Sequence, residues 1–286
     1  MTDFLQLFFS GLATGSIYAL AALGFTLLWQ ASGTINFAQG EFVMLPAFMM
    51  IFGLAAGLPL WMAFILSAVG SVLIQGWLFK RAVVDPLFKF GMMPIVVATI
   101  GLSITMRNAV RAGYSAEPKP FPYLFPDEVY SFAGLNISST DIGTFVFAMA
   151  LVLGVQTFLS RNVTGRAMQA VAQNTESATV LGIDVGRMIF YTFAINALLA
   201  AAAALLVTPT YLAKFDMGAS LGTKAFFAAI IGGFNNSRGA LLGGLLVGVC
   251  ENLAGAYISP AYKEAVARSG EHTSELQSLR HLVCRL

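Results

Sequence analysis

The chain has 286 residues, of which 57% are hydrophobic and only 10% are charged, and its formal net charge is +2. Soluble domains carry about a quarter charged residues. This composition, with a mean hydropathy of +0.77, therefore excludes an ordinary soluble domain and predicts an all-α, multi-spanning membrane protein. The small charge and the lack of a basic stripe also argue against binding to nucleic acid.

The apolar stretches predict about seven or eight membrane segments, because crossing a bilayer core takes roughly 20 apolar residues. The expected segments are 5–29, 42–58, 60–79, 94–110, 142–159, 188–207, the short stretch 225–233, and a helix that continues from 239 to 257. The stretch 225–233 is too short to cross unaided, which is typical of a re-entrant half-helix. Gly11 and Gly15 predict a face for close helix packing on the first segment.

A short polar turn, 32–41, separates the first two segments and holds Asn36, Gln39 and Glu41. Non-helical backbone cannot face lipid, so this turn is expected in water or buried within the protein. The three polar side chains are candidates to line a pathway or to cap helix ends, and physical considerations alone favour the caps.

Basic residues predict the orientation, since cytoplasmic loops are enriched in Lys and Arg. Two clusters are expected in cytoplasmic loops, namely Lys80, Arg81 and Lys89 after the third segment, and Arg161, Arg166 and Arg187 in the loop 161–187. The Pro-rich loop 112–141, the loop 210–224 and the N-terminus are then extracytoplasmic. Arg107 and Arg111, near the far end of the fourth segment, are expected to snorkel to the membrane surface.

The cytoplasmic loop 161–187 predicts a short helix of its own. Asn174 is a good N-cap, Glu176 places an acid in the first turn, and Gly182 is a typical stop signal. A capped helix of about two turns between two long membrane segments is a suitable docking element for another protein.

The last apolar block is rich in glycine and carries one acid. Gly232 and Gly233 precede a helix whose glycines leave a bare face for packing. Glu251 is the single charge within that helix, and a functional residue and a hydrogen-bonded packing acid are equally favoured interpretations.

The segment 268–286 differs abruptly in composition and holds both histidines, His272 and His281. It looks like the translation of a common sequencing adapter. We therefore predict a permease domain at 1–267, a non-native tail at 268–286, and a natural chain that continues after Ala267 with a final apolar segment missing here. The histidines and Cys284 have no ligand-like spacing, so no metal site is predicted.

Enzyme chemistry is not predicted for 1–267. The region has no histidine for a Ser-His-Asp arrangement and no Gly-Lys pair for a phosphate-binding loop. An ion gradient or a partner must then supply energy, and the docking element favours the partner.

Three stretches in order resemble one family, the high-affinity branched-chain amino-acid permease subunits of bacterial ABC importers. They are GSIYALAALGFTLLWQASGTINFAQGEFVML from residue 15, the EAA-like Glu176-Ser177-Ala178-x-x-x-Gly182, and KAFFAAIIGGFNNSRGALLGGLLVGVCENL from residue 224. This chain departs from the family pattern with Asn235-Asn236, where Gly-Ser is more usual.

The resemblance implies a multi-pass subunit of the bacterial inner membrane, paired with a sister permease. Two cytoplasmic ATPase subunits would bind ATP and Mg and power transport, so no cofactor is expected in this chain. A periplasmic binding protein would deliver leucine, isoleucine or valine. Carried over from the family motif, the ATPase-coupling residues would be Glu176, Ser177, Ala178, Gly182 and Ile183.

Alternatives remain open at this stage. Permeases for urea or short amides look similar, and a stand-alone carrier or channel would need no ATPase. Gly232, Gly233 and Glu251 would, in any of these, line the pathway or pack the bundle.

Overall fold

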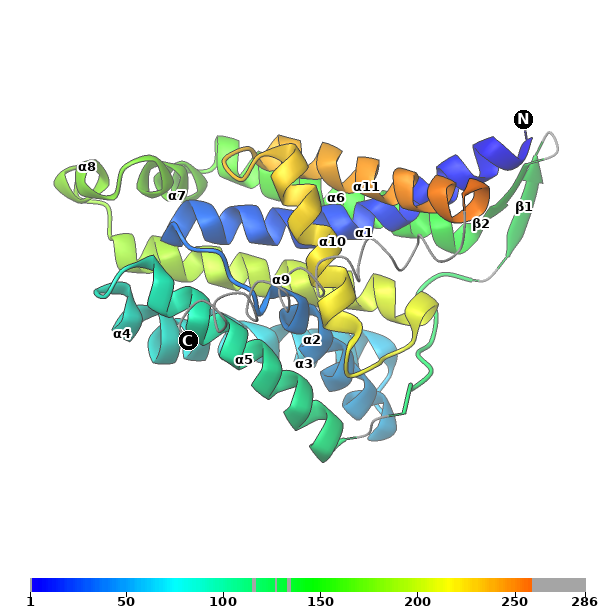
Figure 1. Cartoon of the computed structure of the whole chain (residues 1–286), viewed down its shortest axis with the longest axis horizontal. Helices are drawn as coiled ribbons and strands as arrows, with labels where there is room; N and C mark the ends of the chain where they lie inside the picture. Colours follow the sequence, from blue (N-terminus) through cyan, green and yellow to red (C-terminus); the bar gives the residue numbers. More distant parts are fainter. Residues whose placement is uncertain (1, 115–116, 127, 133–134, 259–286) are drawn as a thin grey trace, which may run out of the picture.

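The computed structural model describes residues 2–114, 117–126, 128–132 and 135–258, so the predicted tail lies outside the described residues. It confirms the predicted all-α membrane architecture (Figure 1). The helices are α1 (Thr2–Ser32), α2 (Gln39–Ala55), α3 (Leu60–Ser71), α4 (Asp85–Phe88), α5 (Met92–Gly113), α6 (Ser139–Arg161), α7 (Val163–Gln173), α8 (Thr175–Val180), α9 (Val185–Tyr211), α10 (Met217–Gly232) and α11 (Ser237–Tyr257). Two π-helical stretches, Val72–Leu78 and Lys80–Val84, join α3 to α4.

Among the described residues, six helical segments are long and apolar enough to cross a membrane, namely α1, α5, α6, α9, α11 and the continuous Leu60–Leu87. The other two apolar helices, α2 with 17 residues and α10 with 16, extend only about 25 Å. Both pack against α1 inside the bundle, and α10 crosses α1 steeply (Figure 1). The short segment expected at 225–233 is thus the second half of α10.

The predicted loop around Lys80 and Arg81 is wrong, because both residues lie in the helix that continues from α3. Lys and Arg are good helix formers, so a charged membrane edge need not end a helix. Lys80 Nζ pairs with Asp85 Oδ1 at 2.9 Å one turn further on, and only Lys89 follows the helix.

The predicted loop 210–224 is also wrong, because α10 begins at Met217 and includes Lys224. The charge of Lys224 led to the predicted loop, since charged residues are rare within membrane segments. The helix α9 likewise continues past the predicted end at Pro209 and reaches Tyr211, with Pro209 in its last turn.

The Pro-rich loop is extended as predicted, and it also contains an antiparallel hairpin that the sequence did not suggest. Strand β1 (Val129–Phe132) pairs with β2 (Leu135–Ser138). Figure 1 places the hairpin and the N-terminus at one end of the molecule, and α4, α7 and α8 at the other. The expected separation of the two kinds of loop is therefore confirmed.

Helix α1 forms the centre of the bundle, and glycines set how closely its neighbours approach. A side chain at Gly11 would meet the backbone of Val249, and one at Gly15 would meet Leu245 on α11. In return, Gly248 lies against the backbone of Gly15. The predicted packing face on α1 is confirmed, and its partner is the bare face of α11.

The two short helices cross through a contact between their backbones. A Cβ at Gly40 would overlap the carbonyl oxygen of Gly218, and Gly222 lies against the same turn of α2. With no side chains between them, α2 and α10 cannot separate or slide without losing their whole contact surface.

We predict that Gly40→Ala lowers the thermal stability of the purified protein in detergent by several degrees, because its methyl group has no free space. Gly101→Ala on α5 is the matched control, since nothing lies within 4 Å of a Cβ there. It should leave stability unchanged or raise it, as alanine stabilises a helix by about 1 kcal/mol over glycine. Equal melting temperatures for the two variants would contradict the close crossing.

Candidate functional site

The loop between α6 and α9 holds the short helix that the sequence predicts, and one further helix. In α8, the Asn174 side chain accepts a hydrogen bond from the Ser177 backbone N–H at 2.8 Å. The predicted cap is thus confirmed. Helix α7, whose cap is Asn162, was not predicted and places α8 at the extreme end of the molecule (Figure 1).

Gly182 ends α8 in the way that a glycine stop requires. Its φ is +79°, a left-handed conformation that side chains disfavour. The Gly182 N–H donates to Thr179 O and the Ile183 N–H donates to Ala178 O, both at 3.0 Å, which is the Schellman motif.

The exposed surface of α8 differs from the expected one. Ala178 is only 1% exposed, so it packs against the chain itself. The exposed residues of α8 include Glu176, Ser177 and, at its end, the apolar pair Val180 and Leu181, which are 87% and 77% exposed. The family motif does not single out these two apolar residues. The sequence signal that could have identified them is an apolar pair next to Gly182 in a loop outside every predicted membrane segment.

A charged cleft of about 550 Å³ lies at the same end, between the end of the α3–α4 helix and the start of α9. Four of its five charged residues form local pairs, Lys80 with Asp85 and Arg187 with Asp184, each at 2.9 Å, and Arg81 lies over the Trp77 ring at 5.7 Å. The cleft thus lies between the end of the α8 loop, at Asp184 and Arg187, and the helix that carries Lys80 and Arg81.

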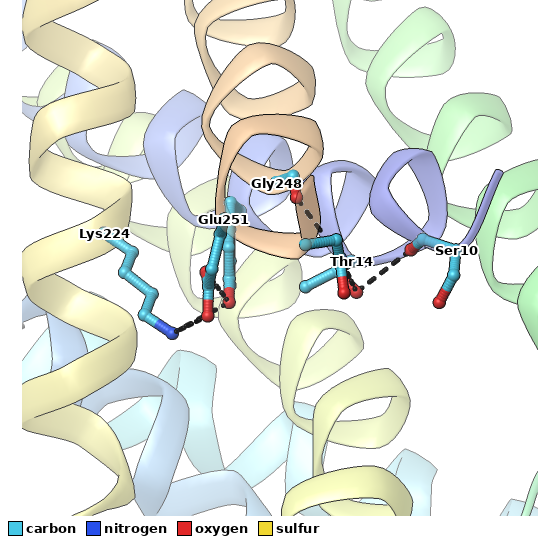
Figure 2. Close-up of polar contacts among 7 residues, drawn as sticks. Ser10, Thr14, Lys224, Gly248 and Glu251 are labelled. Carbon is cyan, nitrogen blue, oxygen red and sulfur yellow. Dashed lines mark hydrogen bonds and ion pairs between the residues drawn. The ribbon is translucent and has the colours of Figure 1, made fainter. Parts of the chain in front are cut away.

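Glu251 is a buried member of an ion pair whose other member the sequence did not predict. Lys224 Nζ lies 2.6 Å from Glu251 Oε1, and the Tyr18 hydroxyl donates to Glu251 Oε2 at 2.8 Å. Lys224 also donates to the Tyr18 oxygen at 3.1 Å. Figure 2 shows Lys224 and Glu251 pointing toward each other from α10 and α11. Lys224 was not among the predicted site residues, because the sequence pattern assigned it to a loop, whereas it lies in α10.

The polar turn before α2 does not consist of helix caps. Gln39 exchanges two hydrogen bonds with Asn196 of α9, at 2.7 and 3.1 Å, and Glu41 Oε1 pairs with Arg107 Nη2 of α5 at 3.0 Å. Asn36 bonds only the nearby Ala38 N–H through Oδ1. The favoured capping interpretation is therefore wrong for Gln39 and Glu41, and Arg107 faces the bundle rather than snorkelling.

Gly232 and Gly233 serve packing and turning. Gly232 lies against the backbone of Gly239 and Ala240, and Gly233 has a φ of +82° at the end of α10. Among the pathway candidates, Gln39, Glu41 and Glu251 thus join separate helices, while these glycines let α10 and α11 meet.

Residues 7–268 match the family described as "Branched-chain amino acid transport system / permease component". The chain belongs to this family. The match covers the bundle, the α8 loop and both buried ion pairs. It confirms the resemblance carried by the three sequence blocks and makes this chain the permease component of a transport system, not itself an enzyme.

Several curated relatives have similar length. The high-affinity branched-chain amino acid transport permease LivH of Salmonella typhimurium is 32% identical over 277 residues, covering 92% of this chain and 90% of the relative. BraD of Pseudomonas aeruginosa, with the same description, is 34% identical over 279 residues, with the same shares covered. The ribose import permease RbsC of Haemophilus influenzae is a more distant relative, at 21% identity over 89% of this chain and 79% of its own length. No solved structure matches the chain.

We predict that Lys224→Met alone strongly destabilises the protein, because it leaves Glu251 charged and unpaired inside the bundle. Breaking such a pair costs about 3–5 kcal/mol, whereas removing both charges is often nearly neutral. The double variant Lys224→Met/Glu251→Gln should therefore recover most of the lost stability and membrane abundance. Thermal unfolding in detergent measures the stability of the single and the double variant. A double variant whose loss of stability equals the sum of the two single losses would contradict the prediction.

Proposed function

We propose that this chain is a membrane-spanning subunit of an ATP-driven importer for branched-chain amino acids in a bacterial inner membrane. The observation that carries the proposal is the match to LivH and BraD over 92% of the chain, because both relatives are described as high-affinity branched-chain amino acid transport permeases. The apolar bundle is compatible with aliphatic substrates. The full assembly would add a sister permease, two cytoplasmic ATPases and a periplasmic binding protein.

The α8 loop is, in this proposal, the place where the ATPase docks. An apolar pair as exposed as Val180 and Leu181, at the tip of a loop beyond the membrane segments, is typical of a protein contact. Glu176 and Ser177 add to the exposed face, Ala178 is buried beneath it, and the backbone hydrogen bonds of Gly182 and Ile183 fix where α8 ends. The basic residues at this end favour the cytoplasm.

ATP and Mg would be bound by the partner subunits, since this chain contributes no phosphate-binding loop of the Gly-Lys type. Its own contribution is the pathway and the mechanical connection. Reconstitution tests this: leucine uptake into proteoliposomes should require ATP and all partners. Uptake by this chain alone that an ionophore abolishes would instead favour a stand-alone carrier.

We predict that Val180→Asp/Leu181→Asp lowers ATP-dependent uptake at least tenfold without reducing insertion of the subunit. Burying two such side chains at a contact contributes about 1.5–3 kcal/mol each, and 1.4 kcal/mol is a tenfold effect. Val163→Asp is the control, because Val163 is also an exposed apolar residue of this loop, on α7. Co-purification of the ATPase measures docking directly. Full ATPase recovery by the double variant would count against docking at α8.

We also predict that Gly182→Val reduces uptake while Gly182→Asn largely preserves it. A β-branched residue is strained at a φ of +79°, whereas Asn tolerates the left-handed region. Space is not limiting, since nothing lies within 4 Å of a Cβ at this position. Uptake per inserted subunit is the measurement, and equal activity of the two variants would show that the α8 stop is unimportant for coupling.

A further inference from the structure

The two ion pairs between helices of the bundle differ in how completely their charges are satisfied. Lys224 and Glu251 are 6% and 8% exposed, and each makes bonds to the other and to Tyr18. Arg107 makes one ion pair, to Glu41, and its side chain is 30% exposed. Its Nε is buried and has no hydrogen-bond partner among the described residues. We call Lys224–Glu251 the closed pair, because each charge is bonded to the other and to Tyr18. We call Glu41–Arg107 the open pair, because Arg107 Nε is a donor without a partner among the described residues.

The unused donor has a defined geometry. In a guanidinium group, Nε and Nη2 lie on the same edge and together match the two oxygens of one carboxylate. Glu41 Oε1 occupies only Nη2 of Arg107, at 3.0 Å. Arg107 Nε and Nη2 can thus donate two parallel hydrogen bonds to one carboxylate, an arrangement that Glu41 does not make in this structure.

Helix α5 presents a polar face to this pair. Thr99, Ser103 and Arg107 recur every fourth residue, so they lie along one face of the helix. Thr99 and Ser103 are buried, and the Thr99 hydroxyl accepts a bond from the Phe37 N–H at 3.2 Å. The opposite side of α5, with Val97 and Ile104, is exposed and apolar as lipid requires. A polar face turned inward in a membrane helix is typical of a pathway.

The segment 33–38, which faces the same helix through Phe37, is not helical. Asn36 is only 5% exposed, yet its Nδ2 has no partner among the described residues. Non-helical backbone between membrane helices is tolerated where it is buried in protein or lines a water-filled cavity. The unpaired amide favours the second of these conditions, since a dry, permanently closed environment would leave it unsatisfied.

We propose that Arg107 and Glu41 receive the α-carboxylate and the α-ammonium of the amino-acid substrate as it passes between α2 and α5. This rests on the proposed function, which supplies a zwitterionic substrate. Separating Arg107 from Glu41 leaves one cation and one anion, and the zwitterion pairs with both, so no charge stays unpaired during the exchange. The aliphatic side chain of the substrate needs no polar partner.

The position of the pair fits the entry side of such a pathway. Helix α5 begins next to α4 and runs away from the end that carries α8 (Figure 1). Arg107 lies in its second half, nearer the end at which the proposed binding protein would deliver substrate. Helix α5 has few fully buried residues (Ile95, Thr99 and Ser103), so little packing must break for α5 to move away from α2.

The test compares two double variants in the assembled importer with leucine-loaded binding protein. Glu41→Gln/Arg107→Gln removes both charges of the open pair and leaves an uncharged polar side chain at each position, and Lys224→Met/Glu251→Gln removes the closed pair as the matched control. We expect the first variant to insert and to co-purify with its partner subunits like the parent, but to take up leucine at least tenfold more slowly. The control should stay within twofold of the parent. Uptake within twofold of the parent by Glu41→Gln/Arg107→Gln would overturn the proposal.

A thiol variant decides the matter if the first double variant fails to assemble. In a background with Cys250→Ser and Cys284→Ser, Ser103→Cys should react with a membrane-impermeant thiol reagent during ATP turnover, and excess leucine should slow that reaction at least threefold. Ile104→Cys, on the exposed apolar side of α5, should not react. Absent labelling at Ser103→Cys, or labelling that leucine leaves unchanged, refutes the pathway. A parent complex that assembles but imports no leucine would instead refute the proposed function.

Discussion

A charge inside a membrane protein must find its partner within the chain, because lipid supplies neither water nor counterions. Here that constraint determines which helices lie together. Glu41 connects α2 to α5 through Arg107, and Glu251 connects α11 to α10 through Lys224. Each short helix thus carries one member of a pair whose other member is on a membrane-spanning helix. Helices of about 25 Å are not positioned by the bilayer alone, and these pairs act together with the glycine contacts between α2 and α10 to hold them in place.

Close packing supplies the rest of the cohesion. Apolar side chains gain little by leaving lipid for a helix interface, so association depends on backbone approach and dispersion. The glycine contacts of α1 with α11, and of α2 with α10, provide that approach in two places. A close backbone contact is either made or lost, with little in between. The bundle is therefore suited to discrete positions of its helices rather than to gradual deformation.

The two ends of the molecule are connected through α9. This helix starts directly after the α8 loop, at Val185, and its Asn196 exchanges hydrogen bonds with Gln39 at the start of α2. Gln39 adjoins Gly40, where α2 crosses α10, and Glu41, where α2 meets α5. In the proposed mechanism, a displacement of α8 by an ATPase therefore reaches both short helices through one rigid element and one buried amide pair.

The sequence alone determined the class, the number of apolar segments and the short α8, since hydropathy, caps and stop signals act locally along the chain. Asn174, Gly182 and the glycine faces of α1 and α11 were all predictable on that basis. The roles of Lys224, Arg107 and Gln39 were not, because each depends on a partner more than 25 residues away in sequence. Local patterns assigned Lys224 to a loop, Arg107 to the membrane surface and Gln39 to a cap. Only the tertiary structure decided otherwise, because a buried polar group takes its conformation from the partner that satisfies it.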